Sequence, residues 1–126
     1  MCVVALCVVS GGLRLPDYAD GVGQRNLEAS YHVLLTMEAM DRTPAAEHHF
    51  LPTVTLGAPQ DKHIPFGSTL PTKAGNYFYV SFFSGGFVLP YAALKLVGAP
   101  FSLHNLALFN SGLGLCGALL LYVLSV

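Results

Sequence analysis

The sequence has few charged residues and few cysteines, and each shortage narrows the class of protein. Only 10% of its 126 residues are charged, whereas soluble domains carry about a quarter. Hydrophobic residues make up 53% of the chain and the mean hydropathy is +0.56, which favours a membrane protein. A net charge of −1 without a basic stripe argues against a nucleic-acid partner. Three cysteines without framework spacing argue against a disulfide scaffold.

Highly specific catalytic motifs are also missing. The sequence contains no phosphate-binding glycine loop, no G-x-S-x-G elbow and no H-E-x-x-H pair. A functional hypothesis therefore depends on the distribution of charge and on the order of the segments.

The charged residues are concentrated in the middle of the chain. No charged residue precedes Arg14, and Lys95 is the only one after Lys73. Between these positions, positive and negative side chains are mixed. This distribution is typical of a polar loop that joins two apolar segments.

The C-terminal segment, residues 101–126, is expected to be a transmembrane helix. Residues 96–126 hold no charge, and the run LALFNSGLGLCGALLLYVLSV within them is as long as the roughly 20 apolar residues that cross a bilayer. Gly112, Gly114 and Gly117 are unfavourable in soluble helices but common in membrane helices, where they let helices approach closely.

The opening stretch MCVVALCVVSGGLRLP is apolar but too short to span a membrane alone. No basic residue precedes it, as a signal peptide would require. Two interpretations of residues 1–13 remain open: an apolar core strand, or the C-terminal half of a partial transmembrane helix. The second interpretation fits its position opposite the later helix and predicts that the sequence is a piece of a longer protein.

Residues 84–100 are expected to form a short helix on the membrane surface. Val88, Tyr91, Ala92 and Lys95 recur at helical spacing, and a glycine and a proline after residue 97 would end the helix. The Lys95 side chain would extend to the lipid head groups.

The extramembrane loop region, residues 14–83, begins with an amphipathic helix in VGQRNLEASYHVLLTMEAMDR, which Asp20 would cap. The apolar face of this helix is expected to hold Leu27, Tyr31, Leu34, Leu35 and Met40. A turn at residues 73–76 leads into a short aromatic strand. The predicted fold class is mainly α membrane protein, in which one complete and one partial transmembrane helix are joined by an external loop with an amphipathic helix and a short β segment.

Three histidines and several carboxylates lie close together in AEHHFLPTVTLGAPQDKHIPFG, and they suggest a metal site at His48 and His49. Glu47 or His49 could meet His63 across the loop. Neighbouring histidines in an extended chain point in different directions, however, whereas the ligands of recognisable sites share one face. A polar loop without a metal is the alternative.

Acids near the first apolar segment are the candidates for catalysis, and they are Asp17, Asp20 and Glu28. A carboxylate at the membrane face, beside a hydrophobic wall, can keep a raised pKa and act as a general base. Candidates for contact with a lipid-linked phosphate are Lys62, His63 and Lys73. Helix capping and solvated surface positions are the alternatives for these residues.

The order of the segments resembles the N-terminal part of bacterial GT-C membrane glycosyltransferases, the clan that includes protein mannosyltransferases and aminoarabinose transferases. The resemblance runs through LPDYADGVGQRNLEASYHVLLTMEAM, the polar loop, GNYFYVSFFSGGFVLPYAALKLVGAP and FSLHNLALFNSGLGLCGALLLYVLSV. It lies in layout more than in motif. Residues 84–87 replace the family's Lys/Arg-Pro-Pro-Leu, and the family's paired Asp-Glu before a Tyr is missing.

The resemblance implies sugar transfer from a polyprenyl-phosphate donor to an acceptor hydroxyl or amine at the outer face of the membrane. It implies a carboxylate base, with basic groups or a divalent metal ion assisting the departure of the phosphate. The donor cavity would need other membrane helices of the same protein, so the chain alone is expected to be inactive. The implied location is a bacterial inner membrane with the loop facing the periplasm.

Two other interpretations remain open. The chain could be a small non-enzymatic membrane protein whose loop binds a partner, or a soluble α/β protein. The loop region holds five of the six Lys and Arg residues, which on the positive-inside rule argues mildly against an external loop. The external placement rests on the resemblance.

Overall fold

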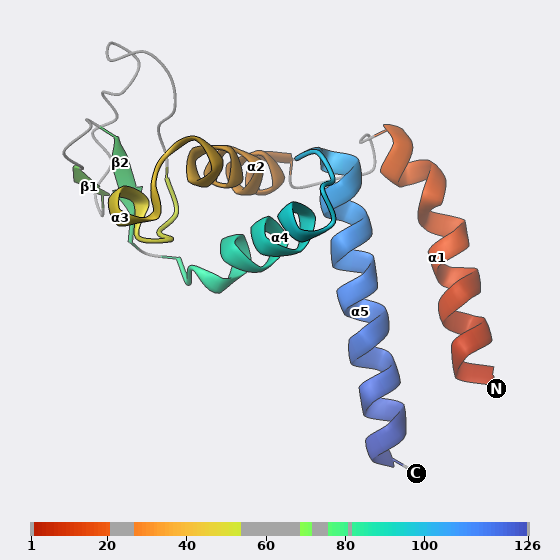
Figure 1. Cartoon of the computed structure of the whole chain (residues 1–126). Coiled ribbons are helices and arrows are strands. Elements are labelled where there is room, and N and C mark those ends of the chain that lie inside the picture. The colour runs from red at the N-terminus through yellow and green to blue at the C-terminus, as the bar shows by residue number, and fades with distance from the viewer. Residues whose placement is uncertain (1, 21–26, 54–68, 72–75, 81, 126) are drawn as a thin grey trace. The chain divides into compact units, whose positions relative to one another are not determined.

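The structure is a computed structural model that describes residues 2–20, 27–53, 69–71, 76–80 and 82–125 (Figure 1). These residues form helices α1, α2 and α3, strands β1 and β2, and helices α4 and α5, in that order. They belong to two compact units: Met1–Arg25 with Ser102–Val126, and Asn26–Phe101. Most of the described residues are helical, so the expectation of a mainly α protein is confirmed for this part of the chain.

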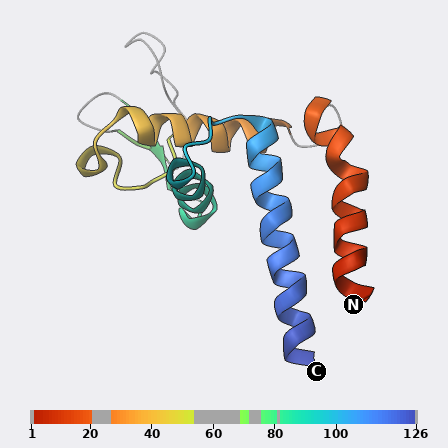
Figure 2. The same cartoon turned by 45° about the vertical axis from the view of Figure 1, so that its right-hand side comes forward.

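The first unit consists of α1 (Cys2–Asp20) and α5 (Leu103–Ser125), which lie side by side and run in opposite directions (Figures 1 and 2). The opening stretch is therefore a helix, and the alternative of an apolar strand is wrong. Its apolar part, Val3–Leu13, is shorter than a bilayer-spanning helix.

By length and composition, α5 is able to cross a membrane. Its 23 residues extend over about 35 Å at the usual helical rise. Only 6% of its most apolar window is buried in the structure, whereas the core helix of a soluble protein would be mostly buried. The Ser102 hydroxyl accepts a hydrogen bond from the Asn105 N–H at 3.2 Å, which caps the N-terminus of the helix.

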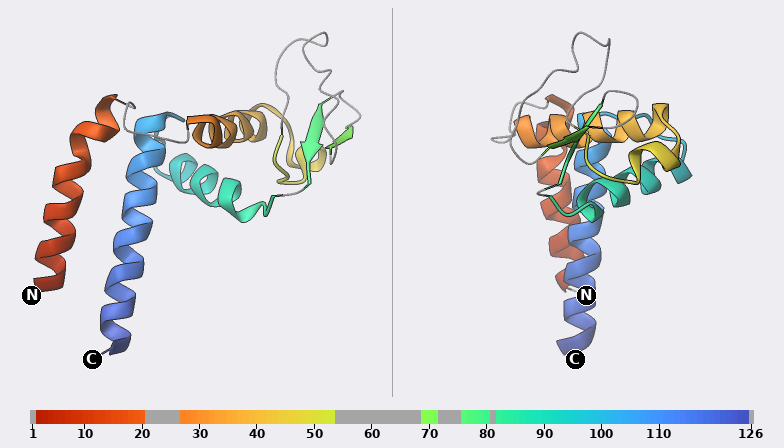
Figure 3. Two further views of the ribbon diagram at one scale, coloured as in Figure 1. Left: turned by 180° about the vertical axis from the view of Figure 1, so that it is seen from behind. Right: turned by 90° about the vertical axis from the view of Figure 1, so that its left-hand side faces the viewer.

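In the second unit, α2 (Leu27–Arg42) packs against α4 (Gly85–Leu96), and the two helices run in roughly opposite directions (Figure 3). Buried residues near the C-terminal end of α2 are Thr36, Met37, Ala39 and Met40. The predicted apolar face is correct at Met40 but wrong at Tyr31, which is 57% exposed. Helix α2 contacts α3 as well as α4, so it is buried on more than one side. A single predicted apolar face therefore does not describe its buried surface.

The predicted cap of α2 is also wrong. Asp20 is the last residue of α1, and α2 begins at Leu27. An N-cap residue directly precedes the first helical residue, so Asp20 is too far from α2 for this role. The sequence prediction ended the first helix too early, because α1 continues through Pro16.

A short helix and a two-stranded sheet complete the second unit. Helix α3 (Ala45–His48) follows Pro44, and β1 (Thr69–Pro71) pairs antiparallel with β2 (Tyr77–Tyr79). On the other edge of β2, the Tyr79 N–H donates to the Pro52 carbonyl at 2.8 Å. Phe78 is buried between two half-buried tyrosines, and the short aromatic strand expected here is thus present. Most of the predicted turn at 73–76 lies outside the described residues.

Helix α4 ends in a glycine turn. Gly98 has a φ of +66°, its N–H donates to the Lys95 carbonyl at 3.2 Å, and the Ala99 N–H donates to the Leu94 carbonyl at 3.0 Å. These two bonds satisfy carbonyls of the last turn, as in a Schellman motif. The surface helix expected over 84–100 is thus shorter at its C-terminal end than predicted.

Candidate functional site

The predicted catalytic acids lie at two helix ends. Asp17 and Asp20 belong to the last turns of α1, three positions apart. Glu28 is the second residue of α2 and belongs to the other unit. Their role as general bases stays a prediction.

The predicted phosphate contacts, Lys62, His63 and Lys73, lie outside the described residues. The segments around them bracket β1, which pairs with β2. Their role also stays a prediction.

A tight turn follows α3 at His48. The His48 side chain is only 3% exposed, and its Nδ1 atom accepts a hydrogen bond from the Phe50 N–H at 2.9 Å. His49 and Phe50 both have positive φ angles, 48° and 57°, a region that costs non-glycine residues about 1–2 kcal/mol each. The His49 N–H donates to the Ala45 carbonyl at 2.9 Å, and the Leu51 N–H donates to the His48 carbonyl at 2.8 Å. These bonds hold the strained turn closed.

Burial lowers the pKa of His48 below its ordinary value. The neighbouring His49 lowers this pKa further, while the carboxylate of Glu47 raises it. The neutral ring also fits the hydrogen bond, because Nδ1 can accept the Phe50 N–H only when it carries no proton. Geometry and environment therefore both favour the neutral tautomer with the proton on Nε2.

The two adjacent histidines face different aromatic rings. The His48 and Phe50 ring centres are 4.9 Å apart, and those of His49 and Phe78 are 6.5 Å apart. Among the residues that the structure describes, no group of three or more His, Cys, Asp or Glu side chains could hold a metal ion. These residues therefore do not form a metal site by themselves, and the predicted third ligand, His63, lies outside them.

An aromatic cluster that the sequence analysis missed surrounds His32. The cluster contains His32 of α2, Tyr79 of β2, Phe82, and Phe87 of α4, with His32 ring-centre distances of 6.1, 6.0 and 5.7 Å to the other three. The sequence contains a signal for this position: His32, Thr36 and Met40 are spaced four residues apart, which places them on one face of the helix. Thr36 and Met40 are both buried. The cluster joins α2 and α4 to the sheet of the second unit.

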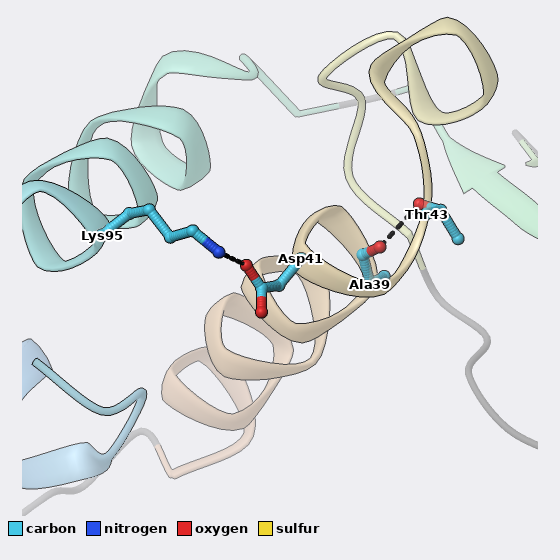
Figure 4. Close-up of polar contacts among 4 residues, drawn as sticks. All are labelled: Ala39, Asp41, Thr43 and Lys95. Carbon is cyan, nitrogen blue, oxygen red and sulfur yellow. Dashed lines mark hydrogen bonds and ion pairs between the residues drawn. The ribbon is translucent and has the colours of Figure 1, made fainter. Parts of the chain in front are cut away.

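An ion pair between Lys95 and Asp41 joins α4 to α2 (Figure 4). The Lys95 Nζ donates to a carboxylate oxygen of Asp41, and this hydrogen bond raises the pKa of Lys95 above its ordinary value. The prediction that Lys95 extends to lipid head groups did not foresee this partner. Nearby, the Thr43 hydroxyl donates to the Ala39 carbonyl at 2.6 Å and closes the last turn of α2 (Figure 4).

Two carboxylates of α2 are thus engaged in ion pairs, since Glu38 also pairs with Arg42 one turn away. Exposed pairs of this kind contribute little to stability, typically about 0–1 kcal/mol each.

No protein-family model matches the chain, and neither a curated protein nor a solved structure is similar to it.

Proposed function

We propose that the chain forms part of an integral-membrane glycosyltransferase of the GT-C kind and contains its first external loop. This enzyme transfers a sugar from a polyprenyl-phosphate donor to an acceptor hydroxyl or amine. Its location is a bacterial inner membrane, with the second unit on the periplasmic side.

One observation carries the proposal: two apolar helices that pack on each other, α1 and α5, flank a compact unit of surface helices in the sequence. The acids lie where the chain leaves the first apolar helix and where the surface unit begins. A membrane enzyme that acts on a lipid-linked sugar needs carboxylates at this level, where the donor head group lies.

In the proposed reaction, the acceptor oxygen or nitrogen attacks the anomeric carbon of the sugar. The bond from that carbon to the phosphate oxygen breaks, and the lipid phosphate leaves with the bonding electrons. Asp17, Asp20 or Glu28 takes the proton from the acceptor. The positive charges of Lys62, His63 and Lys73 stabilise the departing phosphate.

The test is sugar transfer in membrane vesicles that contain the whole protein, with a panel of radiolabelled polyprenyl-phosphate sugars. Asp17→Asn, Asp20→Asn and Glu28→Gln are compared with Glu38→Gln, a matched control whose carboxylate is already paired with Arg42. Loss of a general base lowers the rate by about 10²- to 10⁴-fold. At least one of the three variants should show this loss while Glu38→Gln keeps wild-type transfer. Full transfer in all three variants would remove the catalytic assignment.

A second candidate function is that of a non-enzymatic membrane protein. It is favoured by the open surface of α5, where a Cβ added at Gly112, Gly114 or Gly117 would meet no atom within 4 Å. Such a surface can receive another helix at close range. This function predicts that the three acid variants have no effect on partner binding, whereas Gly114→Leu reduces it.

A further inference from the structure

Helix α1 covers only one side of α5. The half-buried residues Val3, Cys7 and Gly11 recur every four positions in α1, which is the spacing of a single helical face. In the apolar part of α5, Ser111 and Ala118 are half-buried and lie seven positions apart, again on one side. The other sides of α5 are therefore open to a further neighbour along this part of the helix.

A second side of α5 carries residues at alternating spacings of four and three. They are Asn110, Gly114, Gly117, Leu121 and Leu124, all exposed, and we call them the α5 seam. Neighbouring residues of a helix are about 100° apart, so this seam is turned by about 100° from the side that is half-buried at positions 111 and 118. Such a seven-residue repeat is the pattern by which two helices pack along each other.

Asn110 is the residue of the α5 seam that lipid cannot satisfy. Its side-chain amide is exposed and forms no hydrogen bond with the described residues. With α5 centred in a bilayer, Asn110 lies four residues, or about 6 Å, from the midplane, whereas the hydrocarbon extends about 15 Å to either side. Acyl chains offer neither donors nor acceptors to an amide at this depth. The seam therefore needs a partner with a hydrogen-bonding group at the level of Asn110.

A second copy of the chain supplies this group by symmetry. An amide side chain both donates and accepts hydrogen bonds, so two Asn110 side chains complement each other. Two copies inserted in the same orientation have parallel α5 helices, and in a parallel pair each seam residue faces its counterpart in the other chain. No charge opposes this contact, because residues 96–126 hold none.

We propose that two copies of the chain associate in the membrane through the α5 seam, with the two Asn110 side chains hydrogen-bonded to each other. This inference rests on the membrane placement of α5 in the proposed function, but not on sugar transfer. A single polar residue in an otherwise apolar seam also fixes the register of two helices, because any shift along the axis separates the two amides. Below Asn110, the seam residues at 121 and 124 are leucines, which pack on their counterparts.

The experiment measures disulfide cross-linking of single-cysteine variants of the full chain in phosphatidylcholine vesicles, with the three natural cysteines replaced by alanine. Leu121→Cys and Leu124→Cys place a thiol in the α5 seam. Leu120→Cys and Val123→Cys are matched controls, each one position outside the seam and also well exposed, at 61% and 69%. Cross-linking is followed at several ratios of protein to lipid, which gives the strength of self-association.

We expect cross-linked dimers at positions 121 and 124 and far fewer at positions 120 and 123. Adding Asn110→Leu to Leu121→Cys should weaken self-association by about 5- to 30-fold, the range that interhelical hydrogen bonds of model peptides span. Adding Asn110→Gln instead keeps an amide at this level and should retain most of the cross-linking.

Several results would overturn the inference in different ways. Equal cross-linking at positions 120 and 121 would show random collisions and no seam. Cross-linking at position 121 that Asn110→Leu leaves unchanged would remove the amide pair. A maleimide that reacts only in water separates the two remaining cases. If it leaves Leu121→Cys unmodified while no dimer forms, α5 lies in the membrane without self-association. If it modifies Leu121→Cys rapidly, the membrane placement fails, and with it the premise of the inference.

Discussion

Acidification from pH 7 to pH 5 is expected to open the turn that follows α3. The His48 pKa lies below its ordinary value of 6.5, so the unfolded chain binds a proton before the folded protein does. The contribution of neutral His48 to the free energy of unfolding is therefore fully present above about pH 6.5. It is lost as the pH falls through the lower pKa of the folded state. The residues with charge next to the ring are Glu47 and His49, which have opposite effects on this pKa.

The size of the effect follows from the hydrogen bond at Nδ1. When Nδ1 binds a proton, it becomes a donor and faces the Phe50 N–H, which is also a donor. The Phe50 N–H then has lost its acceptor on the buried His48 side chain. A typical intramolecular hydrogen bond contributes about 0.5–1.5 kcal/mol, so its loss corresponds to roughly a two- to thirteen-fold increase in local opening. The positive φ angles of His49 and Phe50 add to the tendency to open once the bond is gone.

The assay is amide hydrogen exchange of Phe50 by NMR in detergent micelles, corrected for the intrinsic exchange rate at each pH. His48→Asn keeps an acceptor near the Nδ1 position but cannot titrate, so its Phe50 protection should not change between pH 7 and pH 5. His49→Asn, at an exposed position, should keep the pH dependence of the wild type. Equal loss of protection in wild type and His48→Asn would refute the reasoning, as would an imidazole titration of His48 at or above pH 6.5.

Two further predictions concern stability, and both are measured by denaturant unfolding in detergent. Met37→Ala should lower the free energy of unfolding by about 2–5 kcal/mol, because Met37 is fully buried, whereas Tyr31→Ala on the same helix should cost far less. Similar losses for both would contradict the packing of α2. Gly98→Ala should cost about 1–2 kcal/mol, because its φ of +66° disfavours alanine although space is free. The control Gly86→Ala lies inside α4, also with free space, and should stabilise the protein by about 0.5–1 kcal/mol. An equal loss at both glycines would show that the positive φ of Gly98 is not the cause.

Long apolar and periodic segments were predictable from the sequence. The uncharged run after Lys95 predicted α5 within two residues at each end, and the aromatic run predicted a short strand at β2. Local signals suffice for such elements, because a helix or strand with a clear period has few competing structures. The glycine and proline after residue 97 likewise predicted the end of α4, and Gly98 forms the turn.

Contacts between distant residues were not predictable from local patterns. Asp41 and Lys95 are 54 positions apart, and nothing in either neighbourhood indicates the other. His32 lies outside the apolar face expected for its helix, yet Tyr79 and Phe87 lie against its ring. Both contacts arise from tertiary packing on several sides of α2. A sequence pattern that describes one apolar face of a helix does not contain this information.

The connection between α4 and α5 leaves very little backbone free to bend. Ala99 is hydrogen-bonded to α4, Pro100 has a fixed φ, the Phe101 ring lies against Tyr91, and Ser102 caps α5. The dihedral angles around Phe101 are the ones left to change. A helix of 23 residues is about 35 Å long and adapts to bilayers of different thickness by tilting. In the proposed membrane placement, any effect of bilayer thickness on the tilt of α5 would therefore act on this short connection.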